Sequence, residues 1–247
     1  MRASRLFACL AGLALASPLA AQISWQPNFN MVANINNAVV LNPCADDGCK
    51  GDKAQPRRGQ PDAARPRPNP LAAQAQLTFV ASPVLRKLNL AAFVDGMRPG
   101  DSAGAAQMAK MFASTDMIEP LGNAIAPTGL KTNNVADAFT LWWTTALNAS
   151  RGRSDSSSRA QIQSVRAQVV KTMLGDQRIA RATAAQKQEF AEDLFVKSRL
   201  LNTAVTEAQG NPDDLASLAR TARKTALATG LDLDTMELTA DGFVSVD

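Results

Sequence analysis

Histidine and tyrosine are absent from the 247 residues of this chain. Histidine is the side chain most used for general acid–base catalysis near neutral pH, so its absence excludes Ser-His-Asp and Cys-His mechanisms. Any catalysis would have to use carboxylates, lysine, serine or a recruited metal ion. The sequence also has no glycine-rich phosphate loop and no metalloprotease motif, so we expect neither a cofactor nor a resident metal ion.

Long hydrophobic runs are missing as well. The apolar stretch at 6–15 is far shorter than the roughly 20 residues that a membrane-spanning helix needs. It follows Arg2 and Arg5 and precedes small residues, an order typical of a secretory signal peptide. We predict a signal peptide at 1–21 with cleavage after Ala21; cleavage after Ala16 is the alternative. The mature protein is then exported, periplasmic or secreted, with no transmembrane segment.

A large excess of charge of either sign is also lacking. Removing a leader that carries two basic residues and no acidic residue lowers the formal net charge from +4 to +2. This value is too small to favour nucleic acid as a partner.

Only three cysteines are present, and two of them, Cys44 and Cys49, remain after the leader. An exported protein meets an oxidising compartment, so we expect these two to form a disulfide. There are two alternatives. The cysteines could bind a metal ion together with nearby aspartates, or they could remain free thiols. Two thiols rarely complete a zinc shell, and the sequence supplies no histidine.

The composition divides the mature chain into three parts. Residues 22–43 form a polar, Asn-rich N-terminal arm. Residues 44–70 are rich in Pro, Arg and Gly with almost no large apolar residue, which predicts a disordered linker. The folded domain is predicted at 71–247.

Helical periodicity dominates this domain. Apolar residues recur at helical spacing, and each run has an N-cap residue such as Ser82, Asn134 or Thr183 and a glycine or proline near its end. Strand–helix alternation is absent, so we predict an all-α fold, an irregular bundle of about six or seven helices. The tail at 231–247 contains Asp241-Gly242 between apolar residues, which indicates a short hairpin or an extended arm.

Two stretches carry a family resemblance. GLKTNNVADAFTLWW at 129–143 and LTADGF at 238–243 resemble motifs of an uncharacterised family of exported bacterial proteins, a domain of unknown function. The resemblance covers roughly residues 75–247. It implies an envelope or secreted location and a helical domain, and it provides no catalytic residue.

The first stretch also contains the residues most suited to binding. Asn134 predicts a helix cap, and Asp137 could reach back to the backbone N–H of the cap; a ligand-binding role for both is the alternative. Trp142 and Trp143 project about 100° apart on the predicted helix. Core packing accounts for both tryptophans, and stacking on a glycan or peptide is the alternative.

Glu189, Glu192 and Asp193 form an acidic cluster on the longest predicted helix. Glu189 and Asp193 lie one turn apart and could act as a carboxylate pair in glycoside hydrolysis. Carboxylates on one helix face are more often solvated and paired with neighbours such as Lys187 or Lys197. Our first hypothesis is therefore a non-catalytic envelope protein that binds a protein or cell-wall component. The second is a histidine-free hydrolase acting on cell-wall glycans.

Overall fold

The structure is a computed structural model that describes residues 75–155 and 157–246. The predicted signal peptide, arm and linker, together with Cys44 and Cys49, lie outside these residues. Within them the chain forms eight α-helices and a two-stranded sheet, which confirms the predicted mostly helical fold with a C-terminal hairpin. The elements are α3 (Pro83–Met97), α4 (Ser102–Ser114), α5 (Ile118–Ile125), η1 (Ala126–Thr128), α6 (Val135–Ser150), α7 (Arg159–Leu174), α8 (Gln177–Arg181), α9 (Ala184–Glu207), α10 (Pro212–Ala228), β1 (Met236–Thr239) and β2 (Gly242–Ser245). The short helix α8 is the one that the sequence analysis did not predict.

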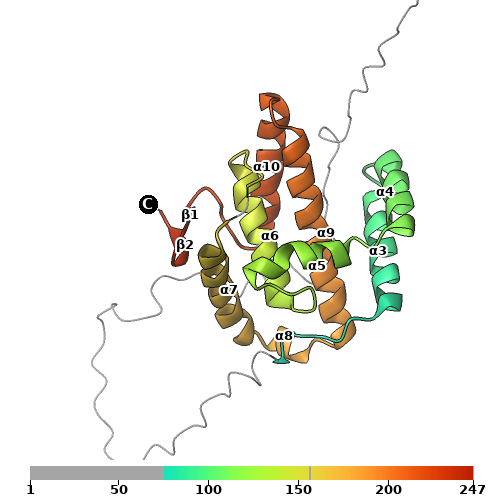
Figure 1. The fold of residues 1–247 in the computed structure, drawn as a ribbon, viewed down its shortest axis with the longest axis horizontal. Coiled ribbons are helices and arrows are strands. Elements are labelled where there is room, and N and C mark those ends of the chain that lie inside the picture. The colour runs from blue at the N-terminus through green and yellow to red at the C-terminus, as the bar shows by residue number, and fades with distance from the viewer. Residues whose placement is uncertain (1–74, 156, 247) are drawn as a thin grey trace, which may run out of the picture.

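Helix α6 lies at the centre of the bundle, between α7, α9 and α10 (Figure 1). Fourteen of its sixteen residues are buried, since other helices cover it on several sides. Its buried threonines, Thr140 and Thr144, donate their hydroxyls to backbone carbonyls of the preceding turn. Its most extensive contacts are with α9, the longest helix in the described part of the chain.

Helix α9 is covered on two sides, by α6 on one and by α3 on another. Helices α3 and α4 pair with each other and lie at the periphery (Figure 1). On α4, Met108, Met111 and Phe112 are half-buried, and only Ala105 is buried. On α3, Val84 and Leu88 are 69% and 61% exposed, since the core contacts of this helix come from Leu90 and Val94.

The helix ends follow the sequence signals. Ser82, Asn134, Thr183 and Asn211 each accept a hydrogen bond from a backbone N–H in the first turn of the helix that follows. None of the described helices is long and apolar enough to cross a lipid bilayer.

The C-terminal tail is a hairpin, with β1 and β2 antiparallel and Leu238 opposite Phe243. It lies against α7, which holds it through polar side chains. Gln161 and Ser164 donate to the carbonyl oxygens of Leu238 and Ala240. A further glutamine of α7, Gln168, accepts from the N–H of Phe243 and donates to its carbonyl oxygen, as a neighbouring strand would.

Candidate functional site

The loop before α6 is fixed by backbone contacts with the segment that precedes α3. Phe79 N–H donates to the carbonyl oxygen of Asn133, and Val135 N–H donates to that of Leu77. Asn134 caps α6, as predicted, since its side-chain oxygen accepts from the N–H groups of Ala136 at 2.9 Å and of Asp137. Asn134 is 4% exposed, so the loop offers little of this side chain to a ligand.

Asp137 is fully buried. The prediction that it accepts a hydrogen bond from the backbone N–H of Asn134 is wrong, because its two oxygens bind other donors. One carboxylate oxygen accepts from Lys131 N–H at 2.9 Å, and the other accepts from Arg166 Nε of α7 at 2.5 Å. Burial raises the pKa of Asp137 above its ordinary value, although Arg166 and Lys131 both act to lower it. Asp137 therefore holds the loop and α7 to the start of α6.

Both tryptophans lie in the core, each 3% exposed. Trp143 Nε1 donates to Thr229 Oγ1 at 3.1 Å, and its ring makes edge contacts with Phe139 and Phe243. Trp142 Nε1 is buried with no hydrogen-bond partner among the described residues. Neither ring is accessible for stacking on a glycan or peptide.

The two carboxylates proposed for hydrolysis, Glu189 and Asp193, lie in different surroundings. Glu189 is exposed, and Asp193 forms the predicted ion pair with Lys197 one turn further along α9. Lys197 is only 6% exposed, however, so this pair does not lie on a solvated face. No group of three or more acidic or cysteine side chains within the described residues is arranged to hold a metal ion.

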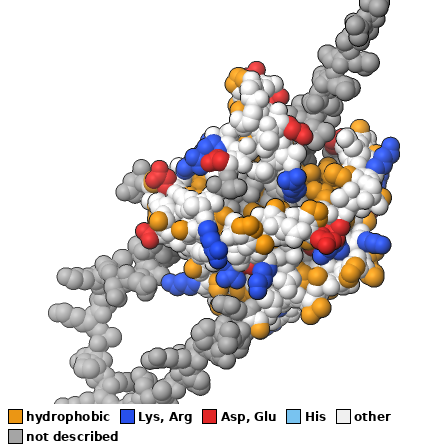
Figure 2. Space-filling model, in the orientation of Figure 1, with side chains coloured by type: hydrophobic (Ala, Val, Ile, Leu, Met, Phe, Trp, Pro, Cys, Tyr) orange, Lys and Arg blue, Asp and Glu red, His pale blue; other side chains and the backbone are white. Residues whose placement is uncertain are grey.

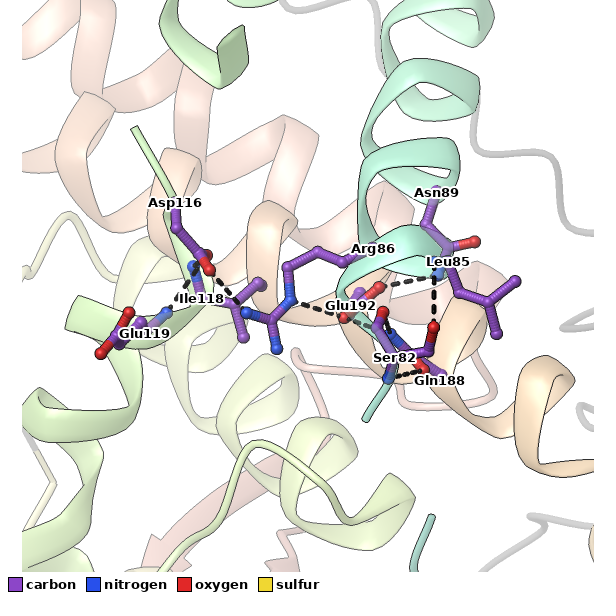
Figure 3. Close-up of polar contacts among 9 residues, drawn as sticks. All are labelled: Ser82, Leu85, Arg86, Asn89, Asp116, Ile118, Glu119, Gln188 and Glu192. Carbon is purple, nitrogen blue, oxygen red and sulfur yellow. Dashed lines mark hydrogen bonds and ion pairs between the residues drawn. The ribbon is translucent and has the colours of Figure 1, made fainter. Parts of the chain in front are cut away.

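The third carboxylate of this cluster, Glu192, is the one that the fold buries. It is 1% exposed and faces α3 (Figure 3). Its oxygens accept from Arg86 Nε at 2.9 Å, Asn89 Nδ2 at 2.7 Å and Gln188 Nε2 at 3.0 Å. Gln188 continues the network by exchanging two hydrogen bonds with the backbone of Ser82. Both oxygens of the Glu192 carboxylate are therefore paired within the protein.

Arg86 extends this network to α5. Its Nη1 lies 2.6 Å from a carboxylate oxygen of Asp116, whose other oxygen accepts from the N–H of Ile118 at the start of α5. Burial acts to lower the pKa of Arg86, but its bonds to Glu192 and Asp116 raise it overall. One guanidinium thus joins α3, α5 and α9, which we interpret as structural.

Sequence reasoning placed Glu192 in a solvated cluster because it considered one buried face of α9. The useful signal was Gln188, one turn before Glu192, together with Phe195, one turn after it. These residues form a second stripe along the helix, and all three are buried. A helix covered on two sides buries positions that a single apolar stripe assigns to solvent.

Comparison with known proteins agrees with the sequence motifs. The model of a family described as a family of unknown function (DUF6683) matches residues 2–245. The chain belongs to this family. No curated protein and no solved structure matches it.

The two family-like stretches lie against the same helix. Helix α7 lies between them and contacts each with a different set of side chains. Towards the first stretch, Arg166 pairs with Asp137, and Gln163 Nε2 donates to the carbonyl oxygen of Thr128 at 2.6 Å. Towards the second, Gln168 binds the backbone of Phe243. Each family-like stretch thus contacts helix α7.

Some residues of the first stretch are not used by the core. Lys131 and Asn133 are exposed, while Leu130 and Val135 on either side are buried. The exposed part of the loop lies beside Arg159 and Arg166 of α7. We call Lys131, Arg159 and Arg166 the basic surface. It is the solvent-accessible polar part of the protein next to the first family-like stretch.

Proposed function

We propose that this protein is an exported bacterial envelope protein that binds a protein or cell-wall component without acting as an enzyme. The sequence supports export through its leader at 1–21, and the helical domain would then fold outside the cytoplasm. The oxidising compartment is also where the predicted disulfide between Cys44 and Cys49 would form.

The observation that carries the proposal is the engagement of the acidic cluster on α9. Glu192 is neutralised by Arg86, and Asp193 by Lys197. A glycosidase instead needs two carboxyl groups on opposite sides of the scissile bond, roughly 5–10 Å apart across a space that admits the sugar. Carboxylates one turn apart on a single helix, one of them already paired, do not provide that arrangement. No specific observation favours the hydrolase.

Export is tested by expressing the full chain in a bacterial host and sequencing the N-terminus of the protein recovered from the periplasm or medium. The expected mature protein begins at Gln22. Unprocessed protein confined to the cytosol would overturn the proposed location.

Binding and catalysis are separated by a second experiment on the mature protein. We expect it to co-sediment with purified cell-wall sacculi or isolated envelope, and to release no soluble fragments from labelled peptidoglycan. Fragment release that disappears in Glu189→Gln or Asp193→Asn would refute the non-catalytic proposal, provided that circular dichroism shows both variants to be folded, since Asp193→Asn also removes the ion pair with Lys197.

A further inference from the structure

We propose that Lys131, Arg159 and Arg166 bind a phosphate group, either a phosphomonoester or a phosphodiester, carried by the envelope component. The inference rests on the proposed binding function and adds the site and the ligand chemistry.

The three cations come from two segments that the fold holds side by side. Arg159, Gln163 and Arg166 lie at positions i, i+4 and i+7 of α7 and so share a face of that helix. This face lies against the loop before α6: Gln163 binds the carbonyl oxygen of Thr128, and Arg159 Nη2 lies 3.8 Å from where a Cβ of Gly129 would stand. Two residues further along the loop is Lys131.

Asp137 fixes the other end of the surface. Its carboxylate bonds Arg166 with one oxygen and the backbone of Lys131 with the other, which places the Arg166 guanidinium beside the loop. The lysine ammonium is also close enough to act electrostatically on this carboxylate. Both ends of the α7 face are thus held to the loop, which fixes the Arg166 guanidinium and brings Arg159 and Lys131 to the same surface before any ligand arrives.

The charge balance of this surface is positive. Asp137 is the one acidic side chain that pairs with any of the three cations among the described residues, so a local charge of +2 remains. Lys131 and Arg159 are exposed, and Arg159 forms no ion pair within the described part of the chain. Figure 2 shows Lys and Arg side chains gathered over α7 and the adjoining loop, so the positive charge faces solvent.

The number and type of donors favour phosphate. A phosphomonoester carries up to two negative charges, which matches a residual charge of +2, and a phosphodiester carries one. Both esters present at least two unesterified oxygens, which guanidinium groups bind in a bidentate manner, and lysine adds a point charge. A carboxylate, like a phosphodiester, would neutralise only half of the residual charge, so the charge balance favours the phosphomonoester. The mature chain is only weakly basic overall, so recognition would depend on this local cluster.

The test is an NMR titration of the 15N-labelled mature protein, residues 22–247, with inorganic phosphate at constant ionic strength. Sodium acetate serves as the carboxylate comparison. We expect saturable shifts in the amides of the loop and of the first turns of α7, with tighter binding of phosphate than of acetate. Equal responses to the two anions would overturn the assignment to phosphate.

The variant is the double substitution Lys131→Gln/Arg159→Gln, which leaves Arg166 in place to neutralise buried Asp137. The matched control is Arg220→Gln/Lys224→Gln on α10, where both side chains are exposed and the charge change is the same. We expect phosphate affinity to fall about tenfold or more in the first variant and to remain within about twofold in the control. Similar losses in both variants would show a non-specific charge effect and overturn the site.

Two further measurements identify the source of the phosphate. Co-sedimentation with vesicles containing phosphatidylglycerol, compared with phosphatidylcholine alone, tests for a lipid headgroup, and titration with glycerol phosphate tests for a soluble phosphomonoester. Failure of the site and failure of the proposed function are distinguishable. Envelope binding that is unchanged in Lys131→Gln/Arg159→Gln overturns the site and leaves the function, whereas an absence of envelope binding in the wild type overturns the function.

Discussion

The substitution Glu192→Gln tests whether the buried polar network holds α3 against α9. It retains the shape of the side chain but removes the negative charge and turns one of its two oxygens into a donor. Glu192 accepts three hydrogen bonds, so at least one of its donors loses its acceptor, and Arg86 retains only Asp116 as an ionic partner.

The expected magnitude follows from these contacts. A hydrogen bond to a charged group contributes about 1.5–3 kcal/mol, and a buried donor without an acceptor adds a desolvation penalty, so we expect Glu192→Gln to lower the free energy of unfolding by about 2–3 kcal/mol. Glu192→Ala, which removes all three acceptor contacts, should lower it by about 3–5 kcal/mol. The measurement is urea denaturation of the mature protein at pH 7, followed by far-UV circular dichroism.

Glu189→Gln is the matched control, because it makes the same change three residues earlier on the exposed face of α9. We expect this variant to lie within about 0.5 kcal/mol of the wild type. A double variant, Arg86→Met/Glu192→Met, should be less destabilised than the two single variants added together, since it leaves no unpaired buried charge. If Glu192→Gln and Glu189→Gln were equally stable, the network would not hold the two helices together.

Three further predictions concern the core and the loops, each measured by urea denaturation. Burial raises the pKa of Asp137, so its stabilising contribution is complete below the unfolded pKa of about 3.9 and is lost as pH rises through the folded pKa. The free energy of unfolding of the wild type, relative to that of Asp137→Asn, should therefore increase as pH falls from 7 towards 4. A decrease would mean that the ion pair with Arg166 outweighs burial. Trp143→Phe should destabilise by about 1 kcal/mol more than Trp142→Phe, because only the former loses an indole hydrogen bond, and equal losses would contradict that role. Gly242→Ala should lower the free energy of unfolding by more than Gly210→Ala, for which we expect roughly 1–3 kcal/mol. Both glycines have positive φ, but a Cβ at position 242 would lie 2.5 Å from a glutamine side chain of α7, whereas a Cβ at position 210 would meet open space.

Local signals in the sequence predicted much of the described fold. Caps such as Asn134 and glycines such as Gly210 fix helix ends by chemistry contained within a few residues, so the sequence alone locates them. The hairpin also follows from a local signal, since Asp241-Gly242 provides a turn between two short apolar segments. The short helix α8 was missed because five residues provide too little periodicity to recognise.

The candidate site depended more strongly on distant contacts. Asp137 was expected to complete a cap of its own helix, but α7 brings Arg166 to it from 29 residues away, and that pairing cannot be read from the local sequence. The same is true of the basic surface, because the spacing of Lys131 from Arg159 becomes meaningful only when α7 lies against the loop.

The sequence by itself determined seven of the eight described α-helices, because hydrophobic periodicity and capping act over one or two turns. Only the tertiary structure decided which charged residues are buried. Glu192 and Glu189 are the same residue type three positions apart on one helix, yet α3 covers the first with Arg86 and Asn89 and leaves the second in solvent. That difference is set by the packing of helices that lie about 100 residues apart in the chain, since a carboxylate can be buried only where another segment supplies its donors.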